Sequence, residues 1–289
     1  MTSDTTLARR WPKDLLDRIV ERDYVLVVGA GISSACLNGK MQRPPGWEAL
    51  LKTLSREFAS GAAKTEASKL IGDGNFLDAA ELVRSQAEDR SRTKDFMRLI
   101  SESVDGKKPD NFQPAPIHDV LLRLDPRIIV TTNYDSILER ASSNGYRVKT
   151  YASTDVGHEV RTGAPLLLKI HGSVDAELDL VLTRSDYSRL RRTGRAALDV
   201  LEALLLTRTT LFVGFSLSDP DIQLLLENNM GREVDSGAHY MLTSSSVPNH
   251  RRRALVRSYG VELIQHQDGD YAEAARMLEL LADLVESSK

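Results

Sequence analysis

Four short apolar runs in the sequence each end in residues that could take part in chemistry. In chain order the endings are VVGAGIS, VTTNYD, KIHGS and VGFS, which offer glycines, an amide, a carboxylate, an imidazole and hydroxyls. Glycine turns can hold phosphate, whereas an amide and an imidazole can orient a water molecule and accept its proton. Because α/β folds place ligands at the carboxyl ends of parallel strands, these endings are candidates for one shared site.

The first ending is a glycine turn between a buried strand and a helix. Gly29 and Gly31 permit a left-handed backbone and a close approach by a ligand, and the next helix would favour a pyrophosphate. A tight turn without a ligand stays open as an alternative. The third glycine of the dinucleotide fingerprint is replaced by Ser34, and no second strand with an acidic residue follows. An ordinary nicotinamide dehydrogenase is therefore disfavoured.

The other endings supply the reactive side chains. Asn133 and Asp135 follow one strand, although both residue types are also favoured helix N-caps. His171 follows the next such strand beside a glycine, where it could face a cleft as a general base. Gly214 and Ser216 could line a nucleotide, whereas Asp219 before a proline is interpreted as a structural helix cap.

The elements that must position these residues alternate between strands and helices. Six apolar runs (YVLVVG, RIIVTT, PLLLKI, TLFVGF, HYMLT and GVELIQ) alternate with amphipathic segments. Continuous apolarity favours strands buried on both faces, so the fold class is α/β, a Rossmann-like parallel sheet flanked by helices. Residues 40 to 120 show only helical patterns and are predicted to be a helical insertion, within a single domain that spans residues 1 to 289.

Composition limits the class of protein. The chain has 289 residues, a formal net charge of −3 and one cysteine, Cys36. These values exclude a disulfide framework and a cysteine-rich zinc ribbon, and they give no electrostatic reason to expect nucleic-acid binding. No apolar segment is long enough for a signal core or a membrane span, so we expect a cytoplasmic protein with no membrane association.

The order of the four endings resembles the sirtuin (SIR2) family, from Val25 to Ile222. The resemblance implies a Rossmann fold that binds NAD⁺ as substrate and cleaves its nicotinamide–ribose bond. It implies catalytic roles for Asn133, which positions ribose or water, and His171, the general base. It also implies that Asp135 contacts the nicotinamide carboxamide. The remaining residues implied to bind the dinucleotide are Gly29, Ala30, Gly31, Ser33, Gly214, Phe215 and Ser216.

Two departures from the family pattern indicate a subtype. Deacylase sirtuins usually carry a four-cysteine zinc ribbon and an Asp-Phe-Arg segment after the glycine turn, and both are missing from this sequence. The chain thus resembles the zinc-less SIR2-like domains of bacterial anti-phage defence, which hydrolyse NAD⁺ as effectors of abortive infection and need no metal. Trp47 follows Pro44, Pro45 and Gly46 as in that group, although it could equally anchor the insertion.

Alternative functions and the partners remain open at this stage. The chain could be a protein deacylase or an ADP-ribosyltransferase, or a non-catalytic module that binds NAD or ADP-ribose for assembly. Because an unrestrained NADase would poison its own cell, we expect control by self-assembly into a homo-oligomer or by a separate protein. The resemblance points to a HerA-type ATPase as that partner. The choice between NAD⁺ and NADP⁺ is undetermined, since no acidic residue can be placed beside the adenosine 2′-hydroxyl.

Overall fold

A seven-stranded parallel sheet forms the centre of the computed structural model, which describes residues 3–230 and 238–289. Its strand order is β5-β6-β4-β1-β7-β8-β9. The strands are β1 (Tyr24–Val28), β4 (Ile128–Thr131), β5 (Arg147–Thr150), β6 (Leu166–Lys169), β7 (Thr209–Val213), β8 (His239–Ser244) and β9 (Val261–His266). The chain adds strands on one side of β1 before β7 continues on the other, so β1 lies at a topological switch point.

The predicted α/β class and parallel sheet are confirmed. Each of the six apolar runs forms a strand, and β1, β4 and β6 are buried throughout. The edge strand β5 was not predicted, because its RVKT sequence is polar and partly exposed. An edge strand is covered by fewer neighbours, so it does not need the continuous apolar run that marks the central strands.

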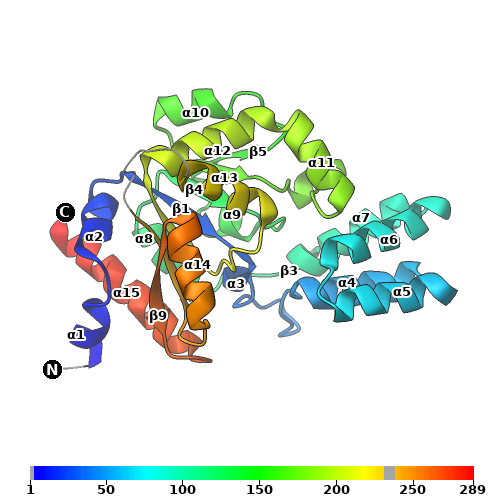
Figure 1. Cartoon of the computed structure of the whole chain (residues 1–289), viewed down its shortest axis with the longest axis horizontal. Helices are drawn as coiled ribbons and strands as arrows, with labels where there is room; N and C mark the ends of the chain where they lie inside the picture. The colour runs from blue at the N-terminus through cyan, green and yellow to red at the C-terminus, as the bar shows by residue number, and fades with distance from the viewer. Residues whose placement is uncertain (1–2, 231–237) are drawn as a thin grey trace.

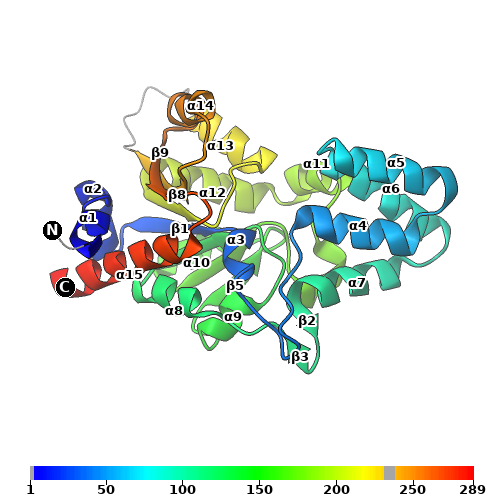
Figure 2. The same cartoon turned by 90° about the horizontal axis from the view of Figure 1, so that it is seen from below.

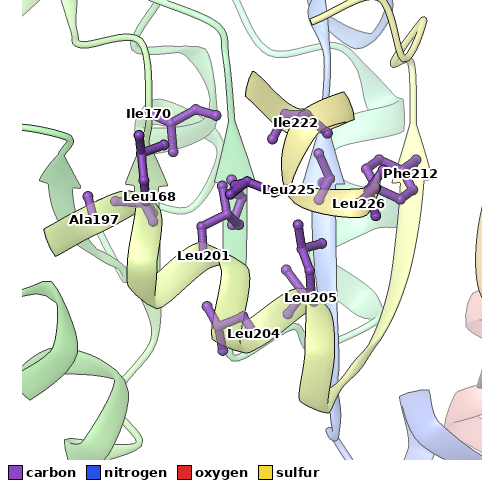
Figure 3. Close-up of a cluster of buried hydrophobic side chains, with 14 of the residues drawn as sticks. Leu168, Ile170, Ala197, Leu201, Leu204, Leu205, Phe212, Ile222, Leu225 and Leu226 are labelled. Carbon is purple, nitrogen blue, oxygen red and sulfur yellow. The ribbon is translucent and has the colours of Figure 1, made fainter. Parts of the chain in front are cut away.

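Helices cover both faces of the sheet (Figure 1). Alternate strand residues divide the core: Val25 and Val27 face one apolar cluster, whereas Leu26 and Val28 face the other. The first face is covered by α10 (Val156–Thr162), α11 (Arg184–Thr193), α12 (Arg195–Thr207), α13 (Pro220–Met230) and α14 (Asn249–Tyr259), and Figure 3 shows leucines of α12 and α13 packed there. The second face is covered by α1 (Ser3–Ala8), α2 (Lys13–Val20), α8 (Pro116–Arg123), α9 (Ile137–Ala141) and α15 (Tyr271–Ser288).

Four helices form a separate layer at the end of the molecule opposite both termini (Figure 2). They are α4 (Trp47–Phe58), α5 (Gly61–Gly72), α6 (Phe76–Asp89) and α7 (Thr93–Asp105), and we call them the helical module. The module has its own apolar core, into which Leu180 and Leu182 insert from the segment after β6. All four helices fall within residues 40 to 120, whereas α8, which begins in that range, packs on the sheet.

A small hairpin leads out of the helical module. It consists of β2 (Gly106–Lys107) and β3 (Asp110–Asn111), which pair antiparallel within residues 40 to 120, the range predicted to be a helical insertion. Within residues 3–230 and 238–289, no helix combines the length and apolarity that crossing a membrane requires. The same residues contain no group of three or more histidine, cysteine or acidic side chains arranged to hold a metal ion.

Candidate functional site

The four endings singled out in the sequence lie at the same carboxyl edge of the sheet. β1 pairs with β4 on one side and β7 on the other, and β6 pairs with β4. Thr131 is opposite Lys169 in the β4–β6 register, so Asn133 and His171 each follow a paired residue by two positions. The Ile170 amide also donates to the Thr131 carbonyl at 3.0 Å, which extends this alignment beyond the strand ends.

The glycine turn packs directly on the end of β7. The Gly29 amide donates to the Val213 carbonyl at 3.0 Å, and the Gly31 amide donates to the Gly214 carbonyl at 2.9 Å. A Cβ on Gly31 would lie 2.9 Å from the Gly214 Cα, and Gly214 itself has φ +62°. These glycines are therefore required by backbone packing, whether or not a ligand binds, as a tight turn alone would predict.

The helix expected after the glycine turn is only one turn long. It is α3 (Ala30–Ser33), which lies between the sheet and α4 (Figure 2). Because the macrodipole grows with aligned peptide units, such a short helix adds less to anion binding than the sequence suggested. Ala30 and Gly31 are nevertheless exposed, so a ligand can reach this edge of the turn.

Ser33 joins the glycine turn to the loop after β4. The Asn133 Nδ2 donates to the Ser33 Oγ at 3.0 Å, and the Ser33 hydroxyl donates to the Asp135 Oδ2 at 2.9 Å. All three side chains are buried. The structure therefore brings together Ser33, Asn133 and Asp135 in one chain of hydrogen bonds that holds Asn133 in a fixed orientation.

Asp135 is a buried residue whose carboxylate and backbone carbonyl both accept hydrogen bonds. Its Oδ1 accepts from the Ile137 amide at 3.1 Å, although the N-cap of α9 is Ser136 and not Asp135, as the capping interpretation had allowed. Burial raises the pKa of Asp135, although the charge of Lys169 and the bond from Ser33 act in the opposite direction. Lys169 is fully buried and its Nζ donates to the Asp135 carbonyl at 2.6 Å and to Glu139 at 2.7 Å.

His171 is held by a second network. Its Nε2 lies 3.1 Å from the Asp219 Oδ2 in an ion pair whose N–H is not well aligned on the oxygen. The same oxygen accepts from the Tyr187 hydroxyl at 2.7 Å, and the Tyr187 ring packs edge-on against the imidazole. Burial acts to raise the pKa of Asp219, but the His171 charge and the hydrogen bonds to the carboxylate keep that pKa below its ordinary value.

The purely structural interpretation of Asp219 is therefore incomplete. Its Oδ1 does cap α13, accepting from the amides of Ile222 at 2.9 Å and Asp221 at 3.1 Å. Its Oδ2 faces His171 at the same time. One carboxylate thus fixes a helix end and the imidazole together, which a sequence pattern reports only as a cap.

The end of β7 contributes an exposed edge. Phe215 is half-buried and packs against Phe212, whereas Ser216 is exposed. The Ser216 carbonyl accepts from Arg251 at 3.2 Å, and its hydroxyl bonds with that of Ser218 at 2.6 Å. Gly214 and Ser216 thus lie beside the glycine turn, where the adenosine side of a dinucleotide was predicted.

The two networks are adjacent but separate. Among the described residues, no hydrogen bond joins Asn133 to His171, which are 8% and 5% exposed. Neither of the two cavities described for this structure contains them: one lies between α11, α12 and α13, and the other adjoins Asp105. The reactive side chains are buried in this conformation, whereas Ala30, Gly31 and Ser216 are open.

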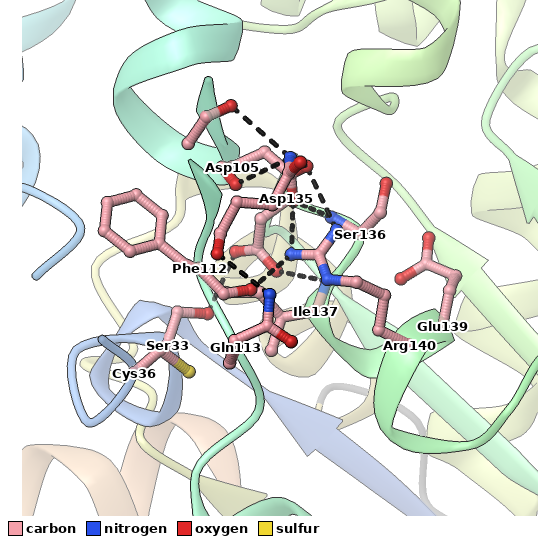
Figure 4. Close-up of polar contacts among 12 residues, drawn as sticks. Ser33, Cys36, Asp105, Phe112, Gln113, Asp135, Ser136, Ile137, Glu139 and Arg140 are labelled. Atoms are coloured by element: carbon pink, nitrogen blue, oxygen red, sulfur yellow. Dashed lines mark hydrogen bonds and ion pairs between the residues drawn. The ribbon is translucent and has the colours of Figure 1, made fainter. Parts of the chain in front are cut away.

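Asp105 is a further residue that sequence reasoning missed. At the end of α7, its carboxylate accepts from the Ser136 amide at 2.8 Å and pairs with Arg140 at 2.8 Å (Figure 4). The helical module is thereby attached to the loop that carries Asn133 and Asp135. Trp47 packs against the module core, as the anchoring interpretation expects. A buried aspartate at a helix end was the available signal, but sequence alone does not reveal burial.

Comparison with known proteins adds an independent observation. Residues 127–264 match the SIR2-like domain family. The chain is 25% identical to the NAD(+) hydrolase ThsA of Acinetobacter baumannii over 240 residues, and 25% identical to that of Bacillus cereus over 238. Each match covers 80% of this chain and 45% of the relative. Defense-associated sirtuin 2 of Bacillus subtilis is 25% identical over 220 residues, 74% of this chain and 20% of that protein. The chain thus spans less than half the length of these relatives.

Proposed function

Because this chain carries a SIR2-like domain, we propose that it hydrolyses NAD⁺ to nicotinamide and ADP-ribose. One observation carries the proposal: Asn133 and His171 are fixed at neighbouring strand ends beside a glycine turn, each by its own buried network. The similarity to NAD(+) hydrolases supports the same reaction. The relatives' role in defence supports placing this activity in an anti-phage abortive-infection response.

The reaction needs little from the protein. Nicotinamide leaves NAD⁺ as a neutral molecule from a cationic state, so no strong general acid is required. The C1′–N bond breaks, the ribose passes through an oxocarbenium-like state, and the oxygen of water forms the new bond to C1′. The water proton must then be accepted by a base.

Asn133 is suited to orient the water or a ribose hydroxyl. Its Nδ2 is used by Ser33, so the amide cannot rotate without losing that bond. Among residues 3–230 and 238–289, no donor is bonded to its Oδ1, which leaves that atom to accept from a substrate hydroxyl or from water. An acceptor that is already fixed beside the reacting carbon reduces the loss of entropy on reaching the transition state.

His171 is suited to accept the proton. The Asp219 carboxylate beside Nε2 favours a proton on that nitrogen, so Nδ1 of the neutral ring keeps its lone pair. Asp219 also stabilises the imidazolium that forms when the proton arrives. Proton transfer to a positioned base contributes roughly 10²–10⁴-fold to a rate.

The glycine turn and the end of β7 would hold the two phosphates and the adenosine. Ala30, Gly31 and Ser216 are exposed, so these parts of the dinucleotide can bind at the surface. The nicotinamide end must then displace side chains that cover Asn133 and His171. We propose that this closed arrangement restrains the enzyme, and that self-association or a separate protein such as a HerA-type ATPase opens it.

The test is incubation of purified protein with NAD⁺ and no peptide, with products separated by chromatography. We expect nicotinamide plus ADP-ribose, and a loss of at least ~10²-fold, or about 3 kcal/mol, in both His171→Ala and Asn133→Ala. His250→Ala, at an exposed position, is the matched control. Because the closed arrangement is proposed to restrain the enzyme, the incubation is repeated at high protein concentration and in the presence of a HerA-type ATPase. Nicotinamide release only with an acyl-lysine peptide, NAD⁺ that stays bound but intact under all of these conditions, or full activity in a folded His171→Ala variant would each refute the proposal.

A further inference from the structure

A second cavity lies beside the candidate site and is not used by the reaction. It has a volume of about 510 Å³ and lies between the end of α7, the β2–β3 hairpin and the start of the 3₁₀ segment Val174–Asp179. We propose that it binds a small phosphorylated ligand, of the sugar-phosphate or mononucleotide class, and that occupancy changes the mobility of the loops carrying Asn133 and His171. The consequence for NAD⁺ cleavage rests on the proposed function, whereas binding itself does not.

The rim of the cavity offers cations for phosphate. Arg98, Lys107 and Lys108 line it, and in the described parts of the chain the two lysines form no hydrogen bond or ion pair. Among the residues that the structure describes, Arg98 is bonded to Asp95 alone, at 2.8 Å, and remains largely exposed. Ammonium groups without partners can approach a phosphate without first breaking an ion pair.

The hairpin presents the lysines from a fixed backbone. The Phe112 amide donates to the Asp105 carbonyl at 3.0 Å, and the Asn111 side chain donates to the Asp105 carboxylate at 2.9 Å. Gly106 has φ +85°, and a Cβ there would lie 2.7 Å from the Asn111 Cα. A rigid hairpin reduces the ordering entropy that ligand binding would otherwise cost.

The polar side chains of the cavity lining suit hydroxyl groups. Asp175, Glu102, Ser101 and Asn111 line it, and all four can accept or exchange hydrogen bonds with a sugar. Asp105 also lines it, but its charge is balanced by Arg140. Arg98 is likewise paired, with Asp95, so the two unpaired lysines lie in the same lining as the carboxylates of Glu102 and Asp175. The volume lies within the roughly 300–1,000 Å³ typical of small-molecule sites.

Lining residues and the adjoining hairpin are hydrogen-bonded to all three loops of the candidate site. Asp105 accepts from the Ser136 amide, in the loop after β4. Asp175, four residues after His171, accepts from the Ser136 hydroxyl at 2.8 Å. Asp110 of the hairpin accepts from the Gly39 amide at 2.6 Å, in the segment after the glycine turn. A ligand held between the hairpin and Asp175 is therefore connected to each of these loops through one hydrogen bond.

The first experiment measures binding of ribose 5-phosphate to the full chain by titration calorimetry, without NAD⁺. We expect the double variant Lys107→Ala/Lys108→Ala to bind at least tenfold more weakly than wild type. Lys64→Ala/Lys69→Ala removes the same charge from exposed positions on α5 and should bind within twofold of wild type. Ribose without phosphate should not bind measurably. Equal affinity in the two double variants, equal binding of ribose, or no binding of ribose 5-phosphate to wild type would overturn the proposal.

The second experiment follows hydrogen exchange of the Ser136 amide. Ribose 5-phosphate should slow this exchange at least threefold in wild type and leave it unchanged in Lys107→Ala/Lys108→Ala. Exchange that does not respond to bound ligand would overturn the coupling. Both readouts are independent of catalysis: binding without NAD⁺ cleavage would refute only the proposed function, whereas cleavage without binding would refute only this inference.

Discussion

Replacement of Asp219 by asparagine tests whether the second network serves catalysis or only the fold. Asparagine keeps an oxygen that can cap α13 through the amides of Asp221 and Ile222, so the helix end should survive. It removes the charge that lies 3.1 Å from His171 Nε2. The variant thereby separates the two roles of the carboxylate.

The magnitude follows from the distance and the burial of the pair. At 3.1 Å and an effective dielectric constant of about 20, two unit charges interact by roughly 5 kcal/mol. Only part of this is available to the transition state, because the imidazolium is incompletely formed and the amide dipole replaces some of the lost field. We expect a loss of about 3–4 kcal/mol, which is roughly 10²–10³-fold in kcat, with a smaller change in KM.

The assay is steady-state NAD⁺ cleavage across a pH series, with thermal unfolding as the check on folding. Asp221→Asn is the matched control. It removes a buried charge from the same helix end, but the carboxylate that it removes pairs with Arg191, at 2.6 Å, and not with His171. A folded Asp219→Asn variant within threefold of wild-type kcat, or an equal loss in Asp221→Asn, would refute the reasoning.

Three other perturbations have distinct expected outcomes. Ser33→Ala should lower kcat/KM by roughly 10-fold or more, because two buried groups lose their shared partner, whereas exposed Ser34→Ala should not. Gly214→Ala should lower the free energy of unfolding by about 2–3 kcal/mol, against about 1 kcal/mol for Gly163→Ala, since both have positive φ but a Cβ at Gly163 meets open space. Burial lowers the pKa of His239 to about 4, so wild type should lose about 2 kcal/mol of stability between pH 7.5 and 5, and His239→Asn should not show this loss.

The sign of the pH prediction follows from the two pKa values of His239. Its usual pKa of 6.5 falls to about 4 in the fold, so between these values the unfolded chain binds a proton that the folded chain does not. Stability is therefore complete above pH 6.5 and is lost as the pH falls towards 4. A pH dependence that is identical in wild type and His239→Asn, measured by chemical denaturation, would contradict it. Equal losses in Gly214→Ala and Gly163→Ala, or in Ser33→Ala and Ser34→Ala, would contradict the other two.

The sheet could be predicted because its strands are buried on both faces. Burial of this kind requires continuous apolar runs. Each run ends at the carboxyl end of a parallel strand, which is the edge of the sheet where α/β folds bind ligands. The order of the strands was not predictable, because the register depends on contacts between distant segments. The sequence pattern therefore placed Asn133 and His171 after strands, whereas their adjacency required the pairing of β4 with β6.

The supporting residues were harder to predict than the reactive ones. Asp219 carries a strong local signal as a helix cap, and that signal conceals its long-range contact with His171. Tyr187 gives no local signal, and Asp105 shows only as an aspartate at a helix end, since each acts across more than thirty positions in the chain. A polar side chain is informative only when its burial is known, and burial is a property of the fold.

The glycines show how packing and ligand binding can impose the same sequence. The turn at Gly29 and Gly31 must contain glycine because Gly214 and Phe215 occupy the space a Cβ would need. That close approach also brings the ends of β1 and β7 together, and Ala30 and Gly31 after β1 and Ser216 after β7 are exposed. Backbone packing thus explains the glycine pattern without a ligand. The same absence of Cβ atoms would also let a dinucleotide approach the backbone closely. Because packing alone accounts for the glycines, the functional assignment depends on Asn133 and His171, which two separate buried networks hold at neighbouring strand ends.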